Sequence, residues 1–125
     1  MSSSSACIRL FCSTGIVVAV KQLFSPQTLL ETLIESNSGK SQVLLIYQSP
    51  LSDEEELATH LLGLEKVIGE KKDALRSIKE NIFNMDVFCK FSSESGQGMC
   101  FVPPECMMTF SQLGMPILID LYPPD

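Results

Sequence analysis

Apolar and polar residues alternate with a period of two in several parts of the chain, the pattern of a strand with one buried face. Residues 7–12 and residues 85–91 both follow this pattern. Residues 42–48 are apolar on both faces, which is typical of a central strand. Two more strands are predicted, one at 99–102, returning from a Gly/Ser turn at 92–98, and one at 115–122.

The first helical pattern begins at Ser25-Pro26, because Ser caps free N–H groups and Pro is tolerated at the first helical position. An apolar stripe at helical spacing follows, formed by Leu29, Leu30, Leu33 and Ile34. The helix is expected to end at 36–39. The β-branched run at 16–20 fits either a strand or a helix.

A second helix is predicted from Ser52, where Ser-Asp-Glu-Glu forms a capping box with Glu55. Its apolar residues share one face, and they are Leu57, Leu61, Leu64 and Ile68. Gly69 ends or kinks this helix. Two shorter helices follow, one carrying Leu75, Ile78 and Ile82, the other opened by Pro103-Pro104 with Cys106, Met107, Phe110 and Leu113 inward and Gly114 as its stop.

These elements predict a single α+β domain over residues 6–125, a mainly antiparallel sheet of about five strands with helices packed on one face. Residues 1–5 are polar and Ser-rich, and we expect a disordered tail there. The chain has 125 residues, of which 45% are hydrophobic. That is the size of one domain, and it can bury a core without disulfides or metal.

The net charge of −6 changes the picture of possible partners. A chain with this charge is repelled by phosphate backbones, so we expect no nucleic-acid partner, and a basic protein is favoured instead. The longest apolar run, residues 16–20, is too short to span a bilayer. Arg9 interrupts the only stretch that resembles a signal peptide. We therefore expect a cytoplasmic protein without a membrane partner.

The cysteines predict a reducing compartment. Their number is odd and no CxxC pair occurs; they are Cys7, Cys12, Cys89, Cys100 and Cys106. Several fall in step with apolar neighbours on predicted elements. Free, buried thiols in the cytosol explain this pattern best, and no disulfide is expected.

No segment has the residue types and spacing of a catalytic or cofactor site. Gly39-Lys40-Ser41 resembles the end of a phosphate-binding loop, but Ile34 stands where that loop needs a glycine. His60 is the only histidine, and a zinc site needs three or four ligands, so we expect a surface or boundary residue. Cys106 lies in a first helical turn, where a thiolate would be stabilised, yet its period matches the core.

Acidic residues give the remaining candidates. The run from Asp53 to Glu56 is either a solvated helix start or a docking surface for a basic protein, and Asp53, Glu54 and Glu56 are the first candidates for partner binding. Asp120 shares a predicted strand face with Leu118 and Tyr122. A buried carboxylate is costly unless paired, so Asp120 is either exposed, paired, or functional.

From residue 51 onward the chain resembles the DUF4279 family of small bacterial proteins. The likeness rests on the helices at 51–68, 73–81 and 104–113, on the strand pair at 85–91 and 99–102, and above all on the ending Leu-Gly-Met-Pro-Ile-Leu-Ile-Asp-Leu-Tyr at 113–122. The first half departs from the family, since its Leu-Gly-x-x-Pro stretch and a Trp near 42–47 are absent. The resemblance implies a small α+β fold and a role as an immunity protein.

We therefore predict a non-enzymatic protein-binding module, most concretely an immunity protein that neutralises a basic bacterial toxin domain, with no cofactor. The alternative is a small cytoplasmic enzyme or ligand-binding domain whose site is assembled from scattered residues. A third possibility is an oligomeric scaffold without a toxin partner.

Overall fold

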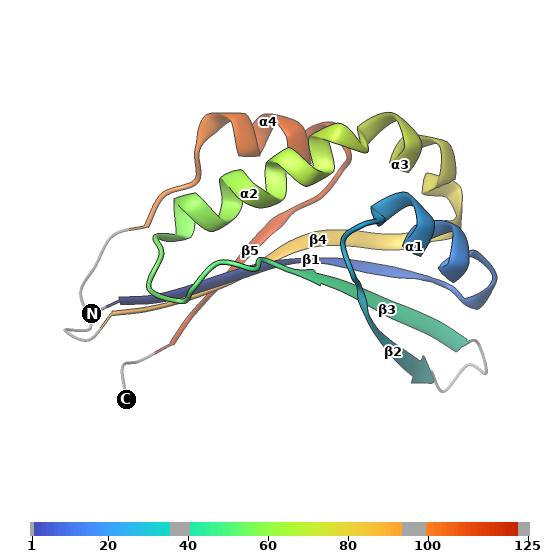
Figure 1. The fold of residues 1–125 in the computed structure, drawn as a ribbon, viewed down its shortest axis with the longest axis horizontal. Coiled ribbons are helices and arrows are strands. Elements are labelled where there is room, and N and C mark those ends of the chain that lie inside the picture. Colours follow the sequence, from blue (N-terminus) through green and yellow to red (C-terminus); the bar gives the residue numbers. More distant parts are fainter. Residues whose placement is uncertain (1, 36–40, 94–99, 123–125) are drawn as a thin grey trace.

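The computed structural model describes residues 2–35, 41–93 and 100–122, which form a five-stranded sheet and four α-helices (Figure 1). The strands are β1 (Ser2–Ser13), β2 (Leu30–Glu35), β3 (Ser41–Gln48), β4 (Ile82–Ser93) and β5 (Ile117–Leu121). The helices are α1 (Val17–Phe24), α2 (Leu57–Glu70), α3 (Lys72–Ile78) and α4 (Pro104–Gln112), with short 3-10 turns at Thr14–Ile16 and Lys79–Asn81. The expected single α+β domain is confirmed.

The sheet has the order β2-β3-β1-β4-β5, so the first strand lies in the middle. All neighbours are antiparallel except β4 and β5, which are parallel. A parallel pair needs a crossover connection, and α4 supplies it here. This is why the returning strand predicted at 99–102 is wrong. Cys100, Phe101 and Val102 lead into α4 and join no strand, while Met99 lies outside the described residues.

Alternation sets the two faces of the sheet. On β1 the residues Ile8, Leu10 and Cys12 are fully buried, whereas Arg9 and Phe11 between them are half-buried on the other side. The buried set belongs to one hydrophobic core that also includes Leu61 and Leu64 of α2 and Phe110 of α4. Figure 1 shows α1, α2, α3 and α4 above the sheet, on the side of this core.

The predicted disordered tail is wrong, because Ser2 to Ser5 form the start of β1. Ser2 lies opposite Ser93 of β4 and Ser5 lies opposite Lys90. A ladder of backbone hydrogen bonds does not depend on apolar side chains, so a serine run can pair when a neighbouring strand is long enough. The strand predicted at 7–12 is otherwise confirmed, with an earlier start.

The helix predicted from Ser25 is also wrong. The ambiguous run at 16–20 is the helical one, since Ile16 ends the 3-10 turn and the rest lies in α1, whereas Leu30–Glu35 is the edge strand β2. Leu30 and Leu33 are largely exposed, so the leucine stripe is not a buried helix face. Pairing with β3, Leu30 opposite Ile46, overrides the local helical spacing. The predicted helix end at 36–39 and most of the Gly39-Lys40-Ser41 turn lie outside the described residues.

The apolar stripe of the second helix is confirmed, but its capping box is wrong. Its members are buried in α2, and they are Leu57, Leu61, Leu64 and Ile68. The helix begins only at Leu57, with Glu56 as N-cap and no side-chain cap. Ser52 instead closes a turn before it: its carbonyl oxygen accepts a hydrogen bond from the Glu55 N–H, 3.1 Å away.

The remaining elements agree with the expected pattern in part. Gln42–Gln48 belongs to the interior strand β3, and Leu75 is buried on α3, but Ile82 begins β4 instead of extending a helix. Cys106 and Phe110 of α4 and Leu113, which caps it, are buried as expected, whereas Met107 is half exposed, against expectation. Gly114 ends α4 with a positive φ of 67°, as a helix stop requires. The rest of the predicted turn at 92–98, beyond the end of β4, lies outside the described residues.

Candidate functional site

The acidic residues lie on the loop that joins β3 to α2, at one end of the molecule (Figure 1, left). The loop is fastened to the sheet, since the Ser4 N–H of β1 donates to the Asp53 carbonyl oxygen at 2.9 Å. Within the loop, the Glu54 N–H donates to Ser52 Oγ at 3.2 Å. The backbone that carries these acids is therefore held in place before any partner arrives.

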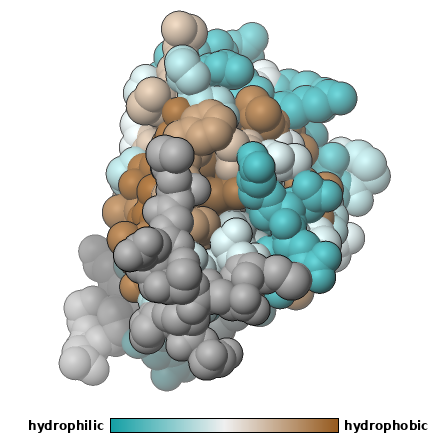
Figure 2. All heavy atoms as spheres, turned by 90° about the vertical axis from the view of Figure 1, so that its left-hand side faces the viewer, coloured by the Kyte–Doolittle hydropathy of each residue, from teal (hydrophilic) through white to brown (hydrophobic). Residues whose placement is uncertain are grey.

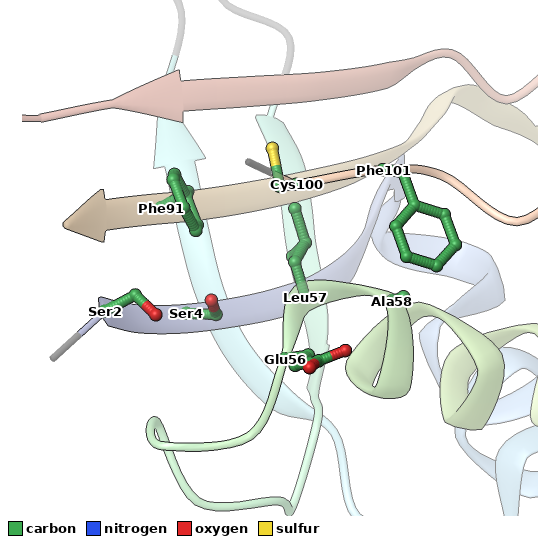
Figure 3. Close-up of a pocket in the computed structure, with 8 residues that line it drawn as sticks. All are labelled: Ser2, Ser4, Glu56, Leu57, Ala58, Phe91, Cys100 and Phe101. Carbon is green, nitrogen blue, oxygen red and sulfur yellow. The ribbon is translucent and has the colours of Figure 1, made fainter. Parts of the chain in front are cut away.

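A hollow of about 270 Å³ lies beside this loop, bounded by the start of β1, the start of α2 and the segment before α4 (Figure 3). Its lining consists of Ser2, Ser4, Glu56, Leu57, Ala58, Phe91, Cys100 and Phe101. The walls are mostly apolar, and Phe101 is 60% exposed. Small-molecule pockets usually have about 300–1,000 Å³. This hollow lies at the lower limit of that range and has room for a long side chain of a partner.

The loop beside the hollow is acidic, and its carboxylates form no ion pair within the described residues. Asp53, Glu54, Glu55 and Glu56 are all exposed. The ion pairs of the described chain lie elsewhere, at Arg9–Asp86, Lys21–Glu31 and Arg76–Asp73, and none joins these acids to a described cation. Figure 2 shows that apolar and hydrophilic surfaces lie side by side at this end of the molecule. The arrangement places one acid of the loop, Glu56, in the wall of a partly apolar hollow.

The structure thus brings together three of the four predicted binding residues, Asp53, Glu54 and Glu56. Asp120 is exposed and lies apart from them, on β5. It stands opposite Lys90 of β4, which in turn stands opposite Ser5 of β1. Since Ser4 lines the acidic hollow and Ser5 points to the other sheet face, Asp120 belongs to that other face.

His60 is not a surface or boundary residue. Its side chain is completely buried, and its Nδ1 lies 2.7 Å from Ser49 Oγ. Within the described chain its Nε2 has no hydrogen-bond partner. A serine beside a histidine is the contact that activates a nucleophile, but Ser49 is only 5% exposed, and neither residue lines the hollow. The hydrogen bond of the pair instead connects the end of β3 to α2. His60 follows Leu57 by three residues, a helical spacing that could have predicted its burial.

All five cysteines are free thiols, as expected. Burial raises the pKa of Cys106 to about 11 and that of Cys89 to about 12. Cys106 is therefore no activated nucleophile despite its place in the first turn of α4. Among the residues that the structure describes, no group of His, Cys, Asp and Glu side chains could hold a metal ion.

Comparison with known proteins adds little to this geometry. No family model matches the chain, and no curated protein matches it. Among solved structures it is similar to MupZ from Pseudomonas fluorescens, at 13% sequence identity, with 94% of this chain and 90% of that chain covered and a TM-score of 0.35. A likeness this low carries no argument about fold or function. Of the helices in the described ranges, none has the length and hydrophobicity needed to cross a membrane.

Proposed function

We propose that this protein is a non-enzymatic binding module that docks a basic segment of a protein partner at the acidic hollow. The observation that supports this proposal is a row of four exposed carboxylates without a described cation, of which the last, Glu56, lines an apolar hollow. An arginine or lysine side chain has the matching form, an apolar stem with a charged end. Its stem would contact the exposed ring of Phe101, and its charge would meet Glu56.

The fixed loop supports tight recognition. Hydrogen bonds from Ser4 and to Ser52 hold the loop backbone, so little ordering entropy is lost when a partner binds. The exposed acids mainly speed the encounter with a basic surface, while the hollow supplies contacts that slow dissociation.

The most concrete form of the proposal is a cytoplasmic immunity protein that masks a basic toxin domain. This form follows from the resemblance to the DUF4279 family. The acidic surface is compatible with it, because electrostatic attraction lets an inhibitor capture a toxin before the toxin reaches its target.

A direct test needs no knowledge of the natural partner. A peptide of alternating arginine and leucine is titrated into isotope-labelled protein, and amide shifts are followed by NMR. We expect the largest shifts at 53–58 and at Phe101. A peptide with glutamate in place of arginine should cause none. Equal binding of both peptides, or shifts concentrated elsewhere, would refute the site.

Variants then separate this patch from overall charge. The triple change Asp53→Asn, Glu54→Gln and Glu56→Gln should slow association by about three- to tenfold at low salt and flatten its salt dependence. The matched control changes three exposed acids outside this loop to Gln: Glu35 at the end of β2, Glu70 at the end of α2, and Glu80 in the turn before β4. Equal slowing in both variants would show that net charge, not this loop, directs binding.

The triple variant must stay folded for this comparison. Acids near a helix start stabilise the helix by about 0.3–1 kcal/mol each. Glu56 makes no side-chain cap hydrogen bond to α2, so its change to Gln removes charge alone. Urea unfolding of both triple variants, measured in parallel, checks this point.

A further inference from the structure

The sheet face opposite the core carries a second hollow, formed by the strands alone. Side chains on this face line up in rows across the sheet, as the register shows. One row runs Leu30, Ile46, Arg9, and the next runs Gln48, Cys7, Phe88. In Figure 1 no helix of the described chain lies below the sheet, on the side of these rows.

The hollow has a volume of about 320 Å³, within the usual range of small-molecule sites. Its apolar surface comes from Leu30 of β2, Leu44 and Ile46 of β3, and Phe88 of β4. Its charged residues are Arg9 and Lys90, and both are cations. An antiparallel sheet commonly leaves one face to solvent, but that face is then mainly polar, so this mixture of aliphatic and cationic side chains is unusual.

Arg9 is a rigid part of the wall. Its Nε and Nη2 donate to the two carboxylate oxygens of Asp86, each at 2.7 Å. Its guanidinium carbon lies 4.6 Å from the centre of the Phe88 ring and 5.6 Å from that of Phe11. The charge of Arg9 is thus balanced by Asp86, and Arg9 shapes the hollow without dominating its charge.

Lys90 supplies the second positive charge of the hollow. Its side chain is exposed and forms no ion pair with any residue in the described ranges. It lies at the far side of the hollow from Leu30, three strands and two rows away. With about 4.8 Å between strands and about 3.3 Å per residue along them, the two Cα atoms are roughly 20 Å apart.

We propose that this hollow binds an aliphatic monocarboxylate, with its chain along Leu30, Leu44 and Ile46 and its carboxylate at Lys90. The charge complementarity favours an anion, although the chain as a whole carries −6. The extended shape favours an unbranched chain. This site lies on the opposite sheet face from the acidic hollow and does not depend on the proposed function.

Asp120 makes the proposal sharply testable. It is exposed, stands opposite Lys90 in the register, and shares the same sheet face. Its carboxylate competes with a bound anion for Lys90. Lys90→Gln should therefore weaken binding, whereas Asp120→Asn should strengthen it. A hydrophobic surface without a charge requirement would respond to neither change.

The experiment titrates methyl-labelled protein with decanoate and, separately, with decylammonium, both at neutral pH and below the concentration at which they form micelles. Decanoate should shift the methyl signals of Leu30, Leu44 and Ile46. Lys90→Gln should weaken decanoate binding about three- to fivefold, as expected for an exposed ion pair, and Asp120→Asn should tighten it about twofold. Lys66→Gln, at an exposed lysine of α2, is the matched control and should leave binding unchanged.

Three outcomes would overturn the proposal: no methyl shift in the hollow with decanoate, equal affinity for decylammonium, or equal effects of Lys90→Gln and Lys66→Gln. Leu30→Gln gives an independent check on the chain-binding end. Leu30 is 63% exposed, so this variant keeps its fold and should still lose at least about threefold in affinity.

Discussion

Removal of the Arg9 guanidinium should destabilise the protein severely. The Asp86 side chain is only 3% exposed, and its two oxygens accept hydrogen bonds from Arg9 at 2.7 Å. Arg9→Met keeps the aliphatic stem but leaves a buried carboxylate without its cation, which costs about 3–5 kcal/mol. That is a large share of the roughly 5–15 kcal/mol that stabilises a typical domain.

The assay is urea unfolding followed by far-UV circular dichroism, because the chain has no tryptophan. Arg76→Met is the matched control: its partner Asp73 is 97% exposed and 3.8 Å away, so the loss should be below about 0.5 kcal/mol. Arg9→Met combined with Asp86→Leu removes both charges and should cost less than the two single changes added together. A loss below about 1 kcal/mol for Arg9→Met, or simple additivity in the double variant, would refute the reasoning.

Three further predictions concern the core and the thiols. Leu61→Ala and Leu64→Ala should each cost about 2–5 kcal/mol in the same urea assay, because both side chains are almost completely buried, and losses under about 0.5 kcal/mol would contradict the packing of α2. Alkylation of native protein without reductant, read by mass spectrometry, should find all five thiols unpaired and Cys100 modified before the four buried thiols, so that early labelling of Cys89 would contradict the burial. Burial raises the pKa of the Cys89 thiol from 9.0 to about 12, so the folded state keeps a proton that the unfolded chain loses above about pH 9. The free energy of unfolding should therefore fall as the pH rises from about 9 to 12. Cys89→Ala should make this fall shallower, and an unchanged slope would contradict the role of Cys89.

Long, regular patterns could be predicted from the sequence. The stripe from Leu57 to Ile68 and the strand at 42–48, which lies within β3, are both confirmed, because a buried helix face and a continuous apolar run each leave a clear pattern. The leucines of β2 led to a wrong helix prediction, since their spacing fits a helix and only pairing with β3 makes them a strand. Ser52 led to a wrong capping box for the same reason: its hydroxyl oxygen accepts a hydrogen bond from the Glu54 N–H in a turn that precedes α2.

The candidate sites differ in the same respect: some depend on neighbours in sequence and others on long-range pairing. The acids at 53–56 are adjacent in sequence, so their cluster was visible at once, whereas the apolar wall beside them comes from α2, β4 and the segment before α4. Arg9 and Asp86 are 77 residues apart and meet only because β1 and β4 pair in one register. No local pattern reports such a register, and the second hollow was invisible for that reason.

The place of β1 in the middle of the sheet has a consequence for biosynthesis. Both of its neighbours, β3 and β4, follow it in the chain, and Ser2 finds its partner only at Ser93. During translation the strand containing Ile8 and Leu10 therefore emerges before both of its partners, and one of its edges stays open until residues 82–93 have been made. Such long-range pairing slows folding and exposes an adhesive edge meanwhile. We expect this nascent chain to depend on chaperones that shield extended apolar segments, more than a protein whose first strand lies at the rim.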